Sequence, residues 1–212
     1  LLNPFGEDQS LMRTTLLAGA LDSLARNFSR KTGQTRFFEV GNVHFDNNAD
    51  LPEERNLLGV AFSGAGEDFF TLKGSLEALL ASFNMHERCT FVPGGGECFQ
   101  PGQKALLLAD GEPIGELGAI HPKVQKAWGI PEKVYYAEIN VEKLRAHKGG
   151  KRTYEPLPRF PKVPRDIAVV VDETVSAAAV KEAIEQAPAA VAIGDVELFD
   201  VYRGAGIPTG KK

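Results

Sequence analysis

The chain has 212 residues, a formal net charge of −4, and a composition that is 43% hydrophobic and 25% charged, near the averages of globular proteins. This length is enough for one large domain or two modest ones with a sizeable buried core. No apolar run approaches the roughly 20 residues of a membrane-spanning helix, and the net charge gives no general sign of nucleic-acid binding.

The two cysteines and the first residues bear on the cellular compartment. Cys89 and Cys98 form no CxxC pair, and residues 1–10 lack the basic region and continuous apolar segment of a signal peptide. We therefore expect a soluble protein of the reducing cytoplasm with no membrane attachment. A disulfide between the two cysteines is the alternative that a secreted protein would favour.

The first part of the chain predicts a mixture of helices and strands. Apolar residues at helical spacing from Leu17 to Phe28 predict a helix that Thr14 or Thr15 caps and Gly33 ends. Residues rich in β-branched and aromatic side chains then predict two strands, at 35–46 and 54–64.

A second helix is predicted after these strands, with Asp68 as its N-cap. Its expected buried face consists of apolar residues at the same spacing, namely Leu72, Leu76, Leu79 and Phe83. Residues 104–120 predict a β-hairpin around Asp110-Gly111, which implies antiparallel pairing. A short helix at 121–128 and a strand at 134–141 complete this part of the chain.

The charge is distributed unevenly. Residues 145–165 contain seven Lys or Arg and one acidic residue, so this stretch carries +6 and the remainder of the chain −10. The same stretch holds two glycines and four prolines, which discourage regular structure. We interpret residues 148–158 as a basic linker between a first domain at 1–147 and a second at 159–212. The alternative is a solvated basic loop without functional consequence.

The second domain predicts a strand, a helix and a strand. Apolar residues occupy both faces of the first strand, at 167–171, and Ser176 caps the helix, whose buried face includes Val180 and Ile184. The second strand is expected at 195–204. These elements are half of a split βαβ sandwich and marginal by themselves, so we expect the chain to be cut from a longer protein.

The motifs that most often indicate catalysis are missing. The glycine-rich stretch 93–102 lacks the spacing of a phosphate-binding loop, and no serine lies in a GxSxG elbow. The histidines are far apart in sequence, and none has a metal-ligand partner three to five residues away. The sequence therefore predicts no catalytic constellation and no metal site.

Several long blocks carry a family resemblance: residues 7–31 (EDQSLMRTTLLAGALDSLARNFSRK), 35–46, 51–64, 68–80, 117–131, 154–173 (YEPLPRFPKVPRDIAVVVDE) and 196–212. Together they resemble the β subunit of bacterial phenylalanyl-tRNA synthetase over nearly the whole chain. The resemblance implies an (αβ)₂ cytoplasmic ligase that joins phenylalanine to tRNA(Phe) using ATP and Mg²⁺. It also implies an α+β fold, with a class II synthetase-like antiparallel sheet and flanking helices in residues 1–147 and a truncated ferredoxin-like anticodon-binding domain in 159–212.

The resemblance also predicts that the first domain is not catalytic. Catalytic class II modules bind ATP with a glycine-rich third motif that ends in arginine, and the corresponding stretch is AEINVEKLRA, residues 137–146. Ile139, Asn140 and Val141 stand where the glycines are needed, and Lys143 stands where the arginine would be. Lysine does not reproduce the planar bidentate contact of arginine. We expect an inactive fragment without a cofactor of its own that serves as a scaffold for the α subunit.

The second domain holds the expected RNA contacts. Arg159, Lys162 and Arg165 precede the first strand, where they would meet phosphates, and Tyr202 and Arg203 on the second strand would stack on an unpaired base. The plainer interpretation is a local ion pair between Arg165 and its neighbouring aspartate, and a sheet-packing role for Tyr202.

Two further expectations concern partners. The outer face of the helix that begins near Leu17 is the expected contact with the α subunit. The resemblance implies that the editing, oligonucleotide-fold and Mg²⁺-linked parts of the family lie upstream of these 212 residues. The competing hypothesis is a stand-alone class II-like paralogue, a regulator that binds a small ligand such as an amino acid near residues 93–102. Ligation of phenylalanine by the chain itself is disfavoured by the missing third motif.

Overall fold

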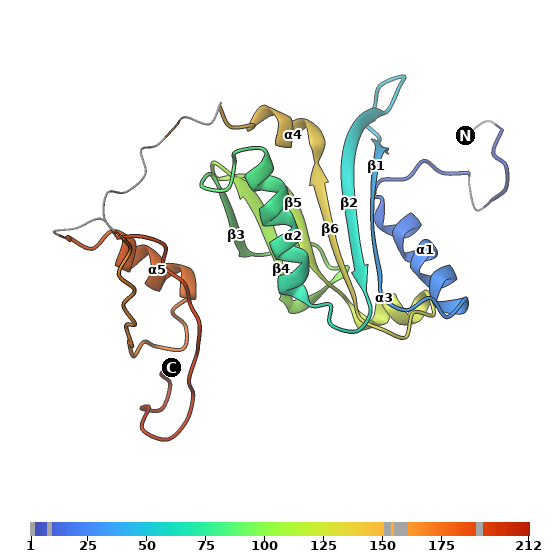
Figure 1. Cartoon of the computed structure of the whole chain (residues 1–212). Coiled ribbons are helices and arrows are strands. Elements are labelled where there is room, and N and C mark those ends of the chain that lie inside the picture. Colours follow the sequence, from blue (N-terminus) through green and yellow to red (C-terminus); the bar gives the residue numbers. More distant parts are fainter. Residues whose placement is uncertain (1–2, 8–9, 151–153, 155–160, 190–192) are drawn as a thin grey trace. The chain divides into compact units, whose positions relative to one another are not determined.

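The computed structural model describes residues 3–7, 10–150, 154, 161–189 and 193–212, and the chain divides into two compact units, Leu1–Thr153 and Tyr154–Lys212 (Figure 1). Each unit is described by itself. Among the helices of the described ranges, none is long and apolar enough to cross a membrane.

Unit 1 is built on one six-stranded sheet in which every pairing is antiparallel. The strands are β1 (Thr35–Phe45), β2 (Glu53–Ser63), β3 (Cys89–Pro93), β4 (Phe99–Ala109), β5 (Glu112–Ile120) and β6 (Val134–Asn140). Their order is β1-β2-β6-β5-β4-β3, so β6 lies inside the sheet and β1 and β3 form its edges. The predicted α+β architecture with an antiparallel sheet is confirmed.

Helices cover both faces of this sheet. On one face, α2 (Phe69–Ser82) and α4 (Val141–Ala146) pack over a core that includes Leu107, Leu117 and Ile139. On the other face, α1 (Leu17–Ser29) and α3 (Pro122–Ala127) pack over a core that includes Ile120 and Tyr136 (Figure 1). The sheet therefore lies between two hydrophobic cores, and each of its inner strands is apolar on both sides.

The beginning and end of α1 differ from the prediction. Leu16, rather than a threonine, is the N-cap residue, although the Thr15 hydroxyl accepts a hydrogen bond from the Leu17 backbone at 3.0 Å. The helix ends at Ser29, before Lys31 adopts a φ of 59°, so Gly33 is not needed to terminate it. The start is decided by a tertiary contact, because the Leu16 backbone N–H donates to Glu138 of β6 at 2.8 Å.

The start of α2 is as predicted, but its buried face is not. The Asp68 side chain accepts from the Thr71 backbone at 2.6 Å and the Thr71 hydroxyl accepts from the Asp68 backbone at 2.9 Å, which is a capping box. The fully buried residues of the helix are Leu72, Leu76 and Leu80. Leu79 and Phe83, expected in the core, are only half-buried. They face the part of the sheet near β1, where no second helix of the described residues covers them.

The hairpin between β4 and β5 forms at the predicted turn, with positive φ at both Asp110 (48°) and Gly111 (83°). The short helix α3 is also confirmed, with its proline at the first turn and His121 Nδ1 accepting from the Lys123 backbone at 3.1 Å. Strand β3 and helix α4 were not predicted from the residue pattern.

Unit 2 contains α5 (Ala177–Glu185), whose predicted cap is confirmed, since Ser176 Oγ accepts from the Ala179 backbone at 3.2 Å. No residue of this helix is buried, so the expected buried face is wrong, with Val180 and Ile184 only half-buried. Within residues 161–189 and 193–212, the predicted strands at 167–171 and 195–204 are likewise not assigned as strands.

Among the described residues of unit 2, the extended segment before α5 pairs with another segment at its end and not along its length. Val171 and Lys212 exchange backbone hydrogen bonds of 3.0 and 3.1 Å, next to an isolated bridge between Asp172 and Lys211. Before this point Ile167 remains 62% exposed. A strand needs a neighbour for its ladder and a packed face for its side chains, and two extended segments with one helix supply too few of either.

Candidate functional site

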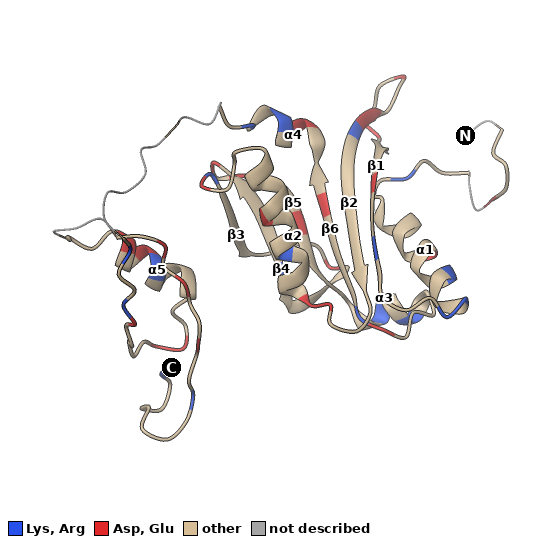
Figure 2. Ribbon diagram, viewed as in Figure 1, with Lys and Arg blue, Asp and Glu red and all other residues tan. Residues whose placement is uncertain are grey.

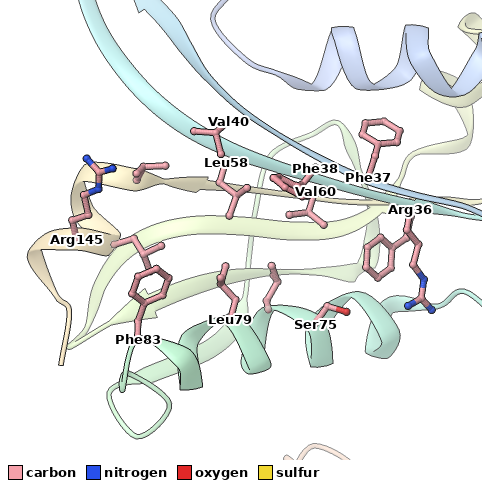
Figure 3. A pocket seen from close by; sticks show the side chains of 14 residues that line it. Arg36, Phe37, Phe38, Val40, Leu58, Val60, Ser75, Leu79, Phe83 and Arg145 are labelled. Carbon is pink, nitrogen blue, oxygen red and sulfur yellow. The ribbon is translucent and has the colours of Figure 1, made fainter. Parts of the chain in front are cut away.

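An open apolar groove of about 660 Å³ lies where β1 and β2 extend beyond the cover of α2 and α4 (Figure 3). The sheet contributes Phe38, Val40, Leu58 and Val60. The opposite wall is formed by Leu76 and Leu79 of α2, its C-cap residue Phe83, and Val141 and Leu144 of α4. Phe38 is 72% exposed and Val40 is 54% exposed, although both belong to a regular strand. Large apolar side chains that stay exposed in a cluster are typical of an interaction surface.

β1 is an edge strand of the described sheet, so the side of its backbone that faces away from β2 has no partner strand. At its far end, the His44 N–H donates to the Arg13 carbonyl at 2.8 Å and the Asn42 carbonyl accepts from Arg13 Nε at 2.9 Å. Because alternate residues point their backbone groups to the same side of a strand, Phe38 and Val40 also direct theirs away from β2. In the part of the chain that the structure describes, these outward groups have no hydrogen-bond partner. The groove therefore combines exposed apolar side chains with an unpaired sheet edge.

One end of the groove is closed by Arg36, which is held in place by unit 1 itself. Arg36 Nε lies 2.7 Å from Glu67, whose side chain is fully buried, and the guanidinium lies over the Phe62 ring at 4.7 Å. Burial opposes ionisation of Glu67, but hydrogen bonds from Arg36, Gln34 and Thr71 outweigh it and keep the pKa of Glu67 below its ordinary value. Arg36 is thus already neutralised.

Arg145 of α4 borders the other end of the groove (Figure 3). No ion pair or side-chain hydrogen bond joins its guanidinium to another described residue. It is therefore the cation at this surface that remains available to a partner, and a carboxylate on that partner would match it.

The outer face of α1, which the sequence suggested as an interface, has a different character. Its exposed residues include Ala18, Gly19 and Asp22, and Asp22 pairs with Arg26 at 2.8 Å. The side chains on this face are small or polar, whereas the groove beside β1 presents large apolar side chains.

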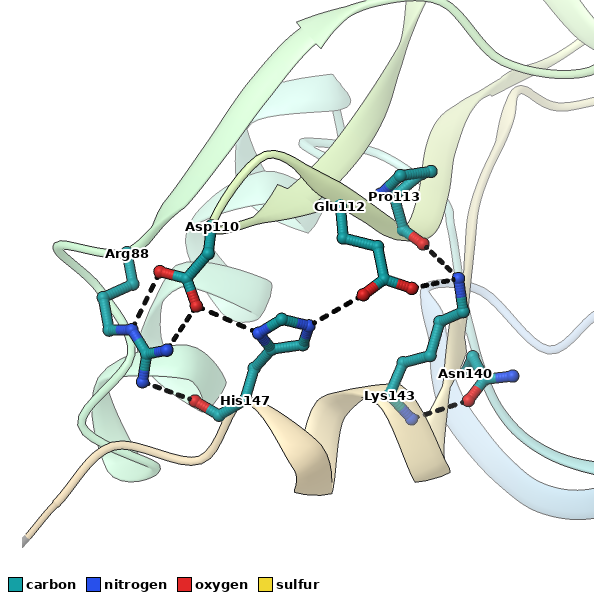
Figure 4. Close-up of polar contacts among 7 residues, drawn as sticks. All are labelled: Arg88, Asp110, Glu112, Pro113, Asn140, Lys143 and His147. Carbon is teal, nitrogen blue, oxygen red and sulfur yellow. Dashed lines mark hydrogen bonds and ion pairs between the residues drawn. The ribbon is translucent and has the colours of Figure 1, made fainter.

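The residues at the degenerate nucleotide motif all have structural contacts. Ile139 is 1% exposed and packs in the core under α2, while Val141 lines the groove. Asn140 caps α4 by accepting from the Lys143 backbone at 2.8 Å. Lys143 Nζ lies 2.7 Å from Glu112 and donates to the Pro113 carbonyl at 3.0 Å (Figure 4). None of the four side chains presents a free group suited to a triphosphate.

The glycine-rich stretch 93–102 is closed by its own contacts. Lys104 Nζ donates to the Gly95 and Gly96 carbonyls at 2.7 and 3.1 Å, and the Gly96 N–H donates to the Glu116 carboxylate at 2.8 Å. A carboxylate that already occupies this N–H would repel a phosphate. The geometry does not favour ligand binding at this loop.

The expected RNA-binding residues are spread over unit 2. Lys162 lies 2.7 Å from Asp195, and Arg203 lies 3.9 Å from Glu173. Arg165 donates to the Pro164 carbonyl at 3.0 Å and forms no ion pair with the neighbouring Asp166. The Tyr202 ring is exposed, and its hydroxyl donates to the Ala205 carbonyl at 3.3 Å. Arg159 lies outside the described residues.

The charge of this part of the chain is mixed. Residues 158–212 contain seven Lys or Arg and eight Asp or Glu, and the two signs are interspersed in unit 2 (Figure 2). No general electrostatic attraction to RNA follows from this composition, so affinity would depend on the particular side chains above.

The cysteines and histidines give no indication of a metal or redox site. Cys89 and Cys98 are both free, and burial raises the pKa of each thiol. Within the described ranges, no cluster of three or more His, Cys, Asp or Glu is arranged to hold a metal ion.

The groove was missed by sequence reasoning. One feature of the sequence could have indicated it. Strand 35–45 carries apolar residues at both odd and even positions, as in the consecutive Phe37 and Phe38, and this pattern indicates that both faces of the strand make contacts. In unit 1 only one of these faces is covered near the edge.

Two family models match the chain. The model described as the phenylalanyl tRNA synthetase beta chain CLM domain matches residues 1–141, and that of the ferredoxin-fold anticodon binding domain matches residues 158–212. The second match confirms the expected ferredoxin-like class of the second part, although its strands are not formed among the described residues.

Curated relatives match over nearly the whole chain. A phenylalanine–tRNA ligase beta subunit from Clostridium tetani is 41% identical over 99% of this chain and 26% of its own length. The corresponding subunit from Halalkalibacterium halodurans is 38% identical over 99% of this chain and 27% of its own length. The subunit from Clostridium acetobutylicum is 35% identical over 99% of this chain and 26% of its own length. The chain spans about a quarter of the length of the relatives that it matches, and the resemblance inferred from the sequence blocks is confirmed.

Proposed function

This chain belongs to the family of the phenylalanyl tRNA synthetase beta chain CLM domain, and from that premise we propose that it acts as a non-catalytic segment of the β subunit of a phenylalanine–tRNA ligase. The complete (αβ)₂ enzyme would join phenylalanine to tRNA(Phe) with ATP and Mg²⁺ in the cytoplasm. Residues 1–147 would be the scaffold for the α subunit, 148–158 a linker, and 159–212 part of the anticodon-binding region.

The observation that carries this proposal is that residues of the degenerate nucleotide motif are used for core packing and for the contacts of α4. Ile139 fills the core, and Asn140 and Lys143 are committed to the capping and anchoring of α4. These side chains do not fit ATP or its Mg²⁺, because a buried isoleucine and a lysine already paired with a carboxylate leave neither space nor free charge. The nucleotide and metal chemistry therefore belongs to the complete enzyme and not to this segment.

The apolar groove beside β1 supports the scaffold role. Its exposed Phe38 and Val40 are costly to leave in water and are suited to burial by a partner chain. We assign this surface to the α subunit, in preference to the small polar outer face of α1. The free Arg145 at the end of the groove predicts an acidic residue on the α subunit opposite it.

The experiment that tests the proposal is a capture assay with the purified α subunit, combined with calorimetry of phenylalanine and ATP binding to the isolated chain. We expect the immobilised chain to retain the α subunit and to show no heat of binding with either small molecule. Binding of phenylalanine without retention of the α subunit would overturn the proposal and favour the amino-acid-binding regulator.

The RNA contacts are tested by replacing Lys162, Arg165 and Arg203 together with alanine. If each meets a phosphate of the anticodon loop, the affinity for an anticodon stem-loop should fall about tenfold at moderate salt, and the slope of log K against log salt should decrease by about 0.7 per lost contact. Filter binding at several salt concentrations measures both. Lys181→Ala on α5, which removes a cation elsewhere in unit 2, is the matched control. An unchanged salt slope in the triple variant would contradict these assignments.

A further inference from the structure

A cluster of five charged or titratable side chains lies where the chain leaves unit 1 (Figure 4). His147, the residue after α4, places Nδ1 3.0 Å from Asp110 and Nε2 3.2 Å from Glu112, both at the β4–β5 turn. Arg88, from the loop before β3, binds both oxygens of Asp110 and donates to the His147 carbonyl at 2.9 Å. Lys143 of α4 holds the other oxygen of Glu112 at 2.7 Å. These are the charged groups that face His147 from the elements around it.

The geometry at His147 requires the doubly protonated ring. A carboxylate is a hydrogen-bond acceptor, so each ring nitrogen must carry a proton to bond the oxygen opposite it. A neutral imidazole has one N–H and would direct the lone pair of its other nitrogen at a carboxylate about 3 Å away. The His147 side chain is only 18% exposed, which limits the water available to relieve this repulsion.

The residues after His147 are docked on unit 1 by backbone contacts. The Gly149 N–H donates to the Phe83 carbonyl at 3.2 Å, and the Asn84 side-chain amide donates to the Gly150 carbonyl at 3.1 Å. A Cβ at position 149 would lie 2.0 Å from the Asn84 carbonyl oxygen, so only glycine allows this approach. Residues 147–150 therefore form a strap across the end of α2, fastened at one end by the His147 cluster.

We propose that His147 is a protonation-dependent latch, which holds residues 147–150 on unit 1 when its ring is a cation and releases them when the ring loses a proton. Release would free four residues, up to about 14 Å of extended chain, from the surface of unit 1. This pH-dependent release goes beyond the scaffold and RNA-binding roles proposed above.

The direction of the pH dependence follows from the paired groups. The hydrogen bond to Asp110 and then that to Glu112 raise the pKa of His147 above 6.5, so its contribution to docking is complete below that value and is lost as the pH rises through the raised pKa. The hydrogen bonds from Arg88 and then His147 lower the pKa of Asp110, and those from Lys143 and then His147 lower the pKa of Glu112. Their contributions are lost only in stronger acid, as the pH falls through the lowered pKa values. The strap is therefore docked below pH 6.5 and is released as the pH rises through the raised pKa of His147.

The test is a pH series on the full chain by NMR, which follows the His147 ring and the hydrogen-exchange protection factor of the Gly149 amide together. We expect the protection factor to fall about fivefold as the ring deprotonates, the scale of one partly exposed charge-assisted hydrogen bond, with the same midpoint for both signals. A protection factor that does not change across the His147 titration, or that changes with another midpoint, would overturn the latch.

Two variants separate the latch from general stability. His147→Gln should give a low protection factor for Gly149 that no longer depends on pH, whereas His86→Gln, at an exposed histidine outside the cluster, should behave as the parent chain. Gly149→Ala blocks docking by collision without altering the charges, and because coupling is reciprocal it should shift the His147 midpoint toward its ordinary value. An unshifted His147 midpoint in Gly149→Ala would show that the ring and the strap are not coupled.

Discussion

Replacing Phe38 and Val40 together with aspartate should abolish capture of the α subunit while unit 1 remains folded. Both side chains are exposed, so their loss removes little of the core, and surface changes of this kind usually alter the free energy of unfolding by about 0.5 kcal/mol. In an interface, loss of a single aromatic anchor costs about 2 kcal/mol or more, roughly thirtyfold in affinity. Two carboxylates buried in an apolar groove would weaken binding by more than about hundredfold.

The control for this experiment is Phe70→Asp. Phe70 is 73% exposed on α2 but does not line the groove, so its replacement introduces the same charge at a comparable apolar position without touching the proposed surface. Surface plasmon resonance with immobilised α subunit measures all three affinities. If the double variant and Phe70→Asp lose affinity for the α subunit equally, the groove is not the contact surface. The same conclusion follows if the double variant captures the α subunit as well as the parent chain does.

The largest expected effect on folding is at Glu138 of β6. Its Oε1 accepts three hydrogen bonds of 2.8 Å, from the Thr15 hydroxyl, the Leu16 backbone N–H and the Tyr136 hydroxyl. Burial and then the Glu138 charge raise the pKa of Tyr136 far above 10, so the phenol stays a donor at every working pH. Glu138 therefore fastens the start of α1 to the middle of the sheet.

Glu138→Ala should lower the free energy of unfolding of unit 1 by about 3 kcal/mol, since a buried phenol and a buried backbone N–H both lose their charged acceptor. Urea denaturation followed by circular dichroism measures this loss. Glu138→Gln keeps an acceptor oxygen, so its free energy of unfolding should fall by less. Glu132→Ala replaces an exposed glutamate, and its free energy of unfolding should stay within about 0.5 kcal/mol of that of the parent chain. A Glu138→Ala chain as stable as the parent would show that α1 is held by apolar packing alone.

Features governed by neighbouring residues were predicted accurately. The N-cap at Asp68 and the turn at Asp110-Gly111 each involve a few adjacent residues, whose own chemistry favours the conformation found. The same holds for the α5 cap at Ser176. The errors lie where a distant element determines the local structure. The start of α1 is an example, because it is held by Glu138, which lies 122 residues from Leu16 in the sequence.

The candidate surfaces were predicted less well for the same reason. Leu79 of α2 has the periodicity of a core residue, and whether such a residue is buried depends on what lies opposite it. Opposite it, the outer part of the sheet near β1 carries no further helix among the residues that the structure describes, which leaves a groove where a core was expected. The RNA-binding residues of unit 2 remain predictions, since the structure pairs Lys162 and Arg203 with nearby acids.

The amino-acid sequence by itself determined the α+β class, most helices and strands of unit 1, and the family, because these depend on local propensity, hydrophobic period and long blocks of matching residues. The tertiary structure alone decided which apolar residues stay exposed beside β1, that residues 167–171 form no strand, and that His147 lies between Asp110 and Glu112. The physical reason is that burial, strand pairing and charge pairing are properties of two partners. The sequence specifies each partner separately, and only the folded chain specifies the distance between them.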